Sequence, residues 1–227
     1  MKGIDRLIVA LDHPSLEAAL LAVDRLGDAA ERYKVGLELY LAAGARAVEE
    51  LTHRGKRVFL DLKLHDIPET VRRAAKLATA DGVDLLTVHA SGGRAMLAAA
   101  VEGAGARARV LAVTVLTSLD AGDLVADGNP MTVEDLVARR ALLAEEAGCA
   151  GVIASPREVA AIRQVVRPEF LIVTPGIRPQ QGGDDQKRTA TAREARAAGA
   201  DAVVVGRPIR DAASPRAVAL ALIEELS

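Results

Sequence analysis

Aromatic residues are scarce in this sequence: they make up 2% of its 227 residues, and tryptophan is absent. Half of the residues are nevertheless hydrophobic, which is enough for a large core. Such a core has to be built from alanine, valine, leucine and isoleucine. These side chains suit helices that pack tightly on strands buried on both faces.

Cysteine is limited to one residue, Cys149. A single thiol excludes an internal disulfide and a cysteine-based zinc site. We therefore expect Cys149 to be a small buried side chain in a reduced, cytoplasmic protein.

An excess of positive charge is also missing, because 29 Lys and Arg stand against 31 Asp and Glu. A nucleic-acid-binding surface would need a clustered basic excess, so we expect no nucleic-acid polymer as a partner. No apolar run approaches the roughly 20 residues of a membrane span. The N-terminal segment contains acidic residues and turns polar within a dozen positions, which is not typical of a signal peptide, so no membrane partner is expected either.

What the sequence has is an alternation of short apolar runs with amphipathic stretches rich in Ala, Glu and Arg. Eight apolar runs predict strands at residues 7–11, 33–36, 58–62, 85–88, 110–113, 151–153, 170–173 and 202–205. Most are continuous rather than alternating, which is typical of strands buried on both faces. The clearest helical patterns between them cover residues 15–26, 69–80 and 133–147. Four glycines follow helical stretches where a C-cap is favoured: Gly27, Gly82, Gly148 and Gly199.

Eight strand–helix units in one chain predict a (β/α)8 barrel, an α/β fold that residues 1–227 would form as a single domain. The alternative is an open, doubly wound sheet. The longest irregular stretch, residues 174–188, is a polar loop whose length is typical of a functional lid. A disordered surface insertion is the alternative interpretation of that loop.

Polar residues follow most of the predicted strands, at the end where a barrel of this type carries its active site. Asp61 and Lys63 are the most informative pair, because a strand's period of two places both side chains on the same side. Asp66 follows three residues later, so two carboxylates are expected to flank one ammonium. Opposite charges keep such a lysine protonated, and it would act as an acid rather than as a Schiff-base nucleophile. The alternative is an ion-pair network that only stabilises the barrel mouth, but Asp12 and Lys34 are expected at the same mouth and favour a functional site.

Gly206 and Arg207 follow the last strand, in a region where many barrels bind phosphate. A glycine lets an anion approach the backbone, and an arginine adds a bidentate donor. The segment 174–176 after the seventh strand fits the same site. The alternative is a plain turn with an exposed arginine.

A metal site is poorly supported by the sequence. The four histidines show no pair at helical ligand spacing, and Lys63 would compete with a Mg²⁺ ion for Asp61 and Asp66. His65 and His89 are expected to be hydrogen-bonded structural residues.

The segment 61–70, DLKLHDIPET, resembles the signature of the orotidine 5′-phosphate decarboxylase family. Five further segments resemble that family in the same order along the chain: 10–12 (ALD), 34–40 (KVGLELY), 115–118 (VLTS), 174–178 (TPGIR) and 206–209 (GRPI). Each is weak alone, but six in order are specific to the bacterial form of the enzyme. The resemblance implies conversion of orotidine 5′-monophosphate to uridine 5′-monophosphate and CO₂ in de novo pyrimidine biosynthesis, with no metal or organic cofactor.

The resemblance also implies roles for single residues. Lys63 would protonate C6 of the pyrimidine as CO₂ leaves, and Asp61 would lie beside the departing carboxylate. Asp66, Ile67 and Thr70 would reach across a homodimer interface into the partner's site, making the active sites composite. The remaining residues would bind substrate: Asp12 and Lys34 the ribose, Thr117 the pyrimidine edge, Gln186 both base and phosphate, and Arg178, Gly206 and Arg207 the phosphate side.

Two other functions remain open at this point. Sugar-phosphate decarboxylases such as 3-keto-L-gulonate 6-phosphate decarboxylase share the Asp-x-Lys-x-x-Asp pattern but use Mg²⁺ and an enediolate; Ile67, Thr117 and the long loop argue against them. A non-catalytic nucleotide-binding barrel would be expected to lose Lys63 or Asp66, and both are present.

Overall fold

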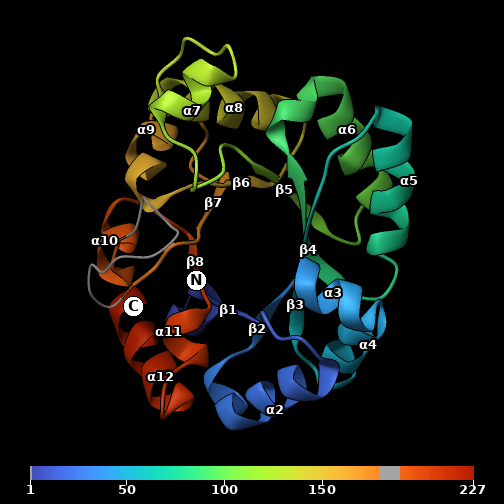
Figure 1. Cartoon of the computed structure of the whole chain (residues 1–227), viewed down its shortest axis with the longest axis vertical. Coiled ribbons are helices and arrows are strands. Elements are labelled where there is room, and N and C mark those ends of the chain that lie inside the picture. The colour runs from blue at the N-terminus through green and yellow to red at the C-terminus, as the bar shows by residue number, and fades with distance from the viewer. Residues whose placement is uncertain (1, 179–189) are drawn as a thin grey trace.

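The computed structural model describes residues 2–178 and 190–227. In these residues eight parallel strands form a closed barrel in chain order (Figure 1): β1 (Leu7–Ala10), β2 (Arg32–Gly36), β3 (Arg57–Leu64), β4 (Val83–His89), β5 (Arg109–Val113), β6 (Gly151–Ile153), β7 (Leu171–Thr174) and β8 (Ala202–Val205). The barrel closes where β1 pairs with β8, with Leu7 opposite Val203. The predicted (β/α)8 barrel is therefore confirmed, and the open sheet is wrong.

Helices surround the barrel on the outside (Figure 1). Those of the described residues are α1 (Gly3–Arg6), α2 (Leu16–Leu26), α3 (Leu37–Ala43), α4 (Arg46–His53), α5 (Pro68–Ala78), α6 (Gly93–Ala104), α7 (Ala121–Ala126), α8 (Val133–Glu146), α9 (Val159–Arg163), α10 (Ala192–Ala197), α11 (Arg207–Arg210) and α12 (Pro215–Leu226). Local chemistry sets their ends. Ser15 and Thr132 cap the first turns of α2 and α8 with their hydroxyls. The four predicted C-cap glycines all have positive φ, from 59° at Gly27 to 104° at Gly199.

Two layers of apolar side chains hold the barrel together. The larger fills the space between the sheet and the helices, and it includes Cys149, which is 4% exposed. Burial raises the pKa of this thiol to about 12, so Cys149 is the inert buried side chain that was predicted. The smaller layer fills the inside of the barrel with residues such as Ile8, Phe59 and Leu85. Strand side chains alternate between the two faces of the sheet. The next inward residue of each strand, two positions towards its carboxyl end, therefore faces the mouth of the barrel.

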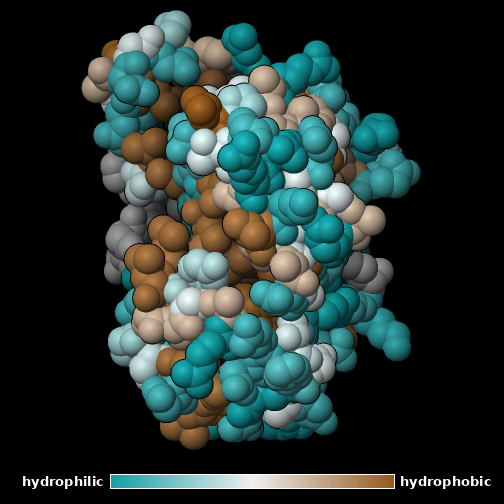
Figure 2. Space-filling model, turned by 90° about the vertical axis from the view of Figure 1, so that its right-hand side faces the viewer, coloured by the Kyte–Doolittle hydropathy of each residue, from teal (hydrophilic) through white to brown (hydrophobic). Residues whose placement is uncertain are grey.

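Apolar surface is exposed on the side of the barrel that carries α3, α4, α5 and α6 (Figure 2). Leu37 and Leu41 of α3 are 51% and 82% exposed, and Ile67, at the start of α5, is 68% exposed. Since α3 follows β2 and α5 follows β3, these side chains lie near the same edge of the barrel.

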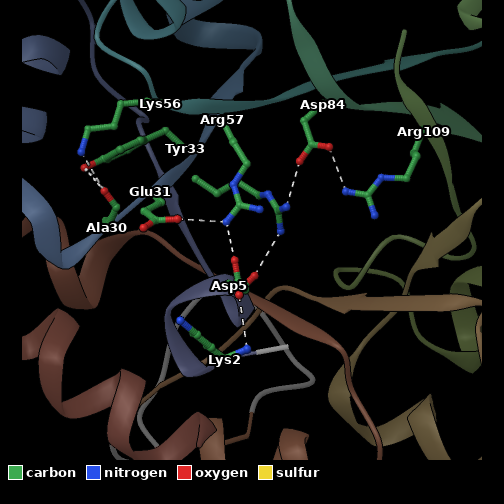
Figure 3. Close-up of polar contacts among 10 residues, drawn as sticks. Lys2, Asp5, Ala30, Glu31, Tyr33, Lys56, Arg57, Asp84 and Arg109 are labelled. Atoms are coloured by element: carbon green, nitrogen blue, oxygen red, sulfur yellow. Dashed lines mark hydrogen bonds and ion pairs between the residues drawn. The ribbon is translucent and has the colours of Figure 1, made fainter. Parts of the chain in front are cut away.

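The amino-terminal end of the barrel is closed by charged residues (Figure 3). Arg32 is 5% exposed and pairs with Asp84 at 2.9 Å, and Asp84 also accepts from Arg109 at 2.8 Å. Arg57 bridges Asp5 at 2.6 Å and Glu31 at 3.2 Å. These pairs tie the beginnings of five consecutive strands, so this end of the barrel serves stability while the opposite end is open.

Predicted strand boundaries agree with the observed ones to within two residues at all eight strands, and the neighbours β3 and β4 differ most, each being three residues longer than predicted. For β3 the apolar run predicted a strand at residues 58–62, whereas the observed strand is Arg57–Leu64. The cause is a break in the pairing of β3 with β4, where residues 61–63 lie opposite Thr87 alone. Hydrophobic periodicity carries no signal for such a bulge.

In the described part of the chain no helix is both long enough and apolar enough to cross a bilayer.

Candidate active site

A cavity of about 390 Å³ opens at the carboxyl ends of the strands. Its floor is apolar and consists of inward-facing residues of five strands: Ala10, Phe59, Val113, Ile153 and Val204. Charged side chains line it from β2, β3 and the segment after β1, and arginines line it from the segments after β7 and β8. The cavity thus has a dry base with charged groups arranged around it.

Four charges of alternating sign line one wall of the cavity. Lys34 Nζ lies 2.9 Å from Asp12 Oδ1 and 3.6 Å from Asp61 Oδ2. Lys63 Nζ lies 2.9 Å from both carboxylate oxygens of Asp61. Asp61 is therefore clamped between two ammonium groups, and the array has no net charge.

Gly36 makes room for this array. A Cβ atom at residue 36 would lie 2.7 Å from Lys34 Nζ and 3.2 Å from Asp12 Oδ1. Any larger residue would displace the ammonium from between its two carboxylates.

Asp61 is a buried carboxylate whose surroundings keep it charged; its side chain is 11% exposed. Burial acts to raise its pKa, but the charges of Lys34 and Lys63, together with hydrogen bonds from Lys63 and Thr87, hold the pKa of this carboxyl below its usual range. A fixed negative charge and a fixed ammonium are thereby held side by side over the apolar floor.

Lys63 has an unusual backbone. Its φ is 52°, and among the described residues it alone combines a positive φ with a side chain. The left-handed region costs an L-residue roughly 1–2 kcal/mol. Strain of this kind is kept where the surroundings impose it, and it is common at active sites.

Three arginines that follow β7 and β8 add positive charge to the cavity lining: Arg178, Arg207 and Arg210. Arg207 and Arg210 lie on the single turn of α11, which follows Gly206 directly. Thr117, from the segment after β5, also lines the cavity. A bound anion would therefore meet both these arginines and the Lys63–Asp61 pair.

The described residues of the site do not form a set of metal ligands. Across residues 2–178 and 190–227, no group of three His, Cys, Asp or Glu side chains is placed to hold a metal ion. The two inward carboxylates, Asp12 and Asp61, are both bound by lysines instead.

Comparison with known proteins identifies the family. Residues 5–222 match the model of the orotidine 5′-phosphate decarboxylase / HUMPS family. The chain belongs to this family. It is 51% identical to the orotidine 5′-phosphate decarboxylase of Methylobacterium radiotolerans over 224 residues, which cover 98% of this chain and 96% of that protein. It is 52% identical to the enzyme of the same name from Moorella thermoacetica, with 100% and 94% covered.

A solved structure shares the fold as well. The crystal structure of orotidine 5′-phosphate decarboxylase from Lactobacillus acidophilus has a TM-score of 0.88, with 38% identity and coverage of 97% of this chain and 98% of that chain. The resemblance inferred from six short segments is therefore confirmed over nearly the whole chain, and so is the prediction of an enzyme of the carboxy-lyase class.

Most of the residues predicted from the sequence of this family member line one cavity. They are Asp12, Lys34, Asp61, Lys63, Thr117, Arg178, Gly206 and Arg207. Three others, Asp66, Ile67 and Thr70, are exposed and lie outside it. Gln186 falls outside the described residues.

Two expectations about polar contacts are corrected. Asp66 does not flank Lys63 within the described chain: its Oδ1 accepts the backbone N–H of Ile67 at 2.6 Å. β3 ends at Leu64, and Asp66 is exposed in the short segment that leads to α5. His65 and His89 form no hydrogen bond among the described residues; their rings pack against each other with centroids 5.4 Å apart.

The sequence interpretation missed two polar residues of the site. Arg210 lies three residues after Arg207, one helical turn further, and its guanidinium donates to the backbone carbonyl of Asp12 at 3.3 Å. Thr87 lies in the apolar run of β4, where alternation with Leu85 and His89 turns it inward. Helical and strand periodicity, applied to polar residues, could have found both.

Proposed function

We propose that residues 1–227 form one enzyme domain that decarboxylates orotidine 5′-monophosphate to uridine 5′-monophosphate in the cytoplasm, without metal or organic cofactor. The observation that carries this proposal is the Lys63 ammonium, held 2.9 Å from a buried Asp61 above an apolar floor. A reaction that builds negative charge on a ring carbon, with no cofactor to accept it, needs such a preorganised cation.

In the proposed reaction the bond between C6 and the carboxylate breaks, CO₂ departs, and the electron pair stays on C6. Lys63 Nζ–H then gives its proton to C6, which forms the new C–H bond. Asp61 lies beside the departing carboxylate and holds Lys63 in place through both oxygens. The neutral amine left on Lys63 regains a proton from solvent after product release. Because the cation is already in position, little reorganisation is needed as charge develops.

The proposed substrate contacts follow from the polar residues that line the cavity. Asp12 and Lys34 are assigned to the ribose hydroxyls, since a carboxylate and an ammonium 2.9 Å apart offer an acceptor and a donor together. Thr117 is assigned to the pyrimidine edge. The phosphate is assigned to Arg178, Gly206 and Arg207, and Gln186 is assigned a bridge between base and phosphate.

Asp66, Ile67 and Thr70 are assigned to the active site of a second copy of the chain. All three are exposed although they directly follow the strand that carries Asp61 and Lys63. The exposed apolar side chains of Leu37 and Leu41 lie near the same edge and would be covered in a two-fold dimer.

Mixed dimers test this assignment. Lys63→Ala and Asp66→Ala are each expected to be inactive as homodimers. After subunit exchange, half of the dimers are mixed, and one site of each would carry both lesions and the other neither, so about a quarter of wild-type activity should return.

The matched control is a mixture of Lys63→Ala with Asp61→Ala, whose lesions are assigned to one chain's own site. That mixture should stay inactive. If it recovers as much as the first mixture, or if the first recovers nothing despite proven exchange, each active site is built from one chain.

Chelation separates the proposal from its nearest alternative, a Mg²⁺-dependent sugar-phosphate decarboxylase. Turnover of orotidine 5′-monophosphate, followed by its absorbance, should be unchanged after dialysis against EDTA, because Asp12 and Asp61 are bound by lysines. Loss of turnover that Mg²⁺ restores would favour the alternative.

A further inference from the structure

Thr87 connects the two charged residues at the centre of the site. It is completely buried, on the inward face of β4. Its Oγ1 lies 2.9 Å from Asp61 Oδ1 and 2.9 Å from the backbone nitrogen of Lys63. No other described side chain contacts both the Asp61 carboxylate and the Lys63 backbone through hydrogen bonds.

The chemistry of the three groups fixes the direction of both bonds. A backbone N–H can only donate, so Thr87 Oγ1 accepts from Lys63. An ionised carboxylate can only accept, so the single hydroxyl proton of Thr87 points to Asp61. The hydroxyl thus donates its one proton to Asp61 and accepts one hydrogen bond from Lys63.

These bonds lie where the sheet itself supplies none. Leu60 pairs with Leu86 and Leu64 pairs with Val88, so residues 61–63 lie opposite Thr87 alone. In a regular ladder a backbone N–H of this kind donates to a carbonyl of a neighbouring strand. The Thr87 hydroxyl takes that place.

The left-handed backbone of Lys63 depends on the same contact. A φ of 52° is unfavourable for lysine, and a buried N–H without an acceptor would add to the cost. The Thr87 hydroxyl gives this N–H its acceptor in the bulged conformation. That conformation turns the lysine side chain so that Nζ meets both oxygens of Asp61.

We propose that Thr87 is a positioning residue of the decarboxylase, whose buried hydroxyl holds the Lys63 backbone and the Asp61 carboxylate in one fixed arrangement. This inference rests on the proposed roles of Lys63 and Asp61. Thr87 itself does not line the cavity, so it acts through these two residues rather than on the substrate.

The role predicts how activity responds to small changes at residue 87. Thr87→Val keeps the shape but removes both bonds, and kcat should fall about 10- to 100-fold, the range expected when a hydrogen bond to a charged group is lost. KM should change less than about threefold, because the ribose and phosphate contacts remain. Thr87→Ser restores the hydroxyl and should recover most of kcat.

The pH profile gives a second readout that a purely structural role would not move. The hydrogen bond from Thr87 favours the charged form of Asp61, so its loss raises the pKa of that carboxyl. Activity needs the charged form, which is present above the pKa. The acid limb of kcat against pH should therefore move to higher pH in Thr87→Val and return in Thr87→Ser.

Thr79→Val is the matched control. Thr79 is equally buried and its hydroxyl also donates a hydrogen bond, to the Ala75 carbonyl at 2.9 Å, but it lies at the end of α5. It should lower thermal stability about as much as Thr87→Val and leave kcat within about twofold of wild type.

The outcomes separate this inference from the proposed function. If the wild-type protein fails to decarboxylate orotidine 5′-monophosphate, the proposed function is wrong. If the wild type is active and folded Thr87→Val keeps kcat within twofold, or if Thr87→Ser loses as much as Thr87→Val, the positioning role alone is wrong. Should Thr87→Val not fold, Thr87→Cys, which keeps the volume with only a weak donor, takes its place with the same expected loss.

Discussion

Replacing Lys63 with alanine is expected to lower kcat for orotidine 5′-monophosphate by about four orders of magnitude or more. Two contributions are lost together: a positioned proton donor, worth about 10²- to 10⁴-fold, and a preorganised charge, worth about 10²- to 10³-fold. Alanine suits the left-handed backbone no better than lysine, so folding should change little at φ 52°. Product binding should remain measurable by titration calorimetry, because the arginines that line the cavity are unchanged.

Lys63→Arg separates the two contributions. Arginine keeps a positive charge but does not release a proton in proteins, so it should remain far below wild type if proton transfer matters. The exposed Lys76 on α5, replaced by alanine, is the control for loss of an ammonium elsewhere and should be fully active. A loss of less than about a hundredfold in Lys63→Ala, the low end for one acid–base group, would contradict the assigned role.

The sequence predicted the barrel because its buried strands are continuous apolar runs, a pattern that does not depend on details of pairing. It also predicted that Asp61 and Lys63 would point the same way. The structure confirms the contact, yet Lys63 reaches it through a left-handed residue inside a bulge rather than through regular alternation. The correct pairing therefore arose from a local geometry that periodicity does not describe.

Asp66 shows where spacing fails. Three residues after Lys63, it was expected to flank the same ammonium, but the chain leaves the barrel between them and the carboxylate is exposed. Spacing along a sequence describes one chain and contains no information about a second copy. Whether such a residue belongs to the active site of its own chain or of a second copy depends on the conformation of the loop and on the position of that copy.

Thr87 shows a second limit. In an apolar run, one threonine is an ordinary strand residue with good β-propensity. Its importance comes from a neighbour on the next strand, Lys63, whose N–H lacks a partner in the ladder. A backbone donor that requires an acceptor from the next strand can be recognised only when the pairing register of the two strands is known.

Replacing Arg207 with alanine should lower kcat/KM for orotidine 5′-monophosphate. The expected loss of transition-state stabilisation is about 2–4 kcal/mol, as for removal of a charged hydrogen-bond donor. Arg207 lines the cavity from the segment after β8, whereas Lys63 lines it from β3, so this loss would come from remote binding energy that orients the substrate. Arg54→Ala is the control, because Arg54 follows α4 at the other end of the barrel and pairs with Asp24. It should leave kcat/KM unchanged.

The phosphate-free nucleoside shows whether Arg207 acts on the phosphate. It lacks the group that Arg207 is assigned to bind, so Arg207→Ala should hardly change its already slow decarboxylation. Measuring both substrates with both proteins gives a double-perturbation cycle, and its interaction energy isolates the contact between Arg207 and the phosphate. That energy should equal most of the 2–4 kcal/mol, or roughly a 30- to 1,000-fold ratio of rates. Equal damage to both reactions would instead mean that Arg207 supports the structure of α11, and the phosphate would then have to bind to other residues of the cavity, with Arg178 and Arg210 the first to be tested.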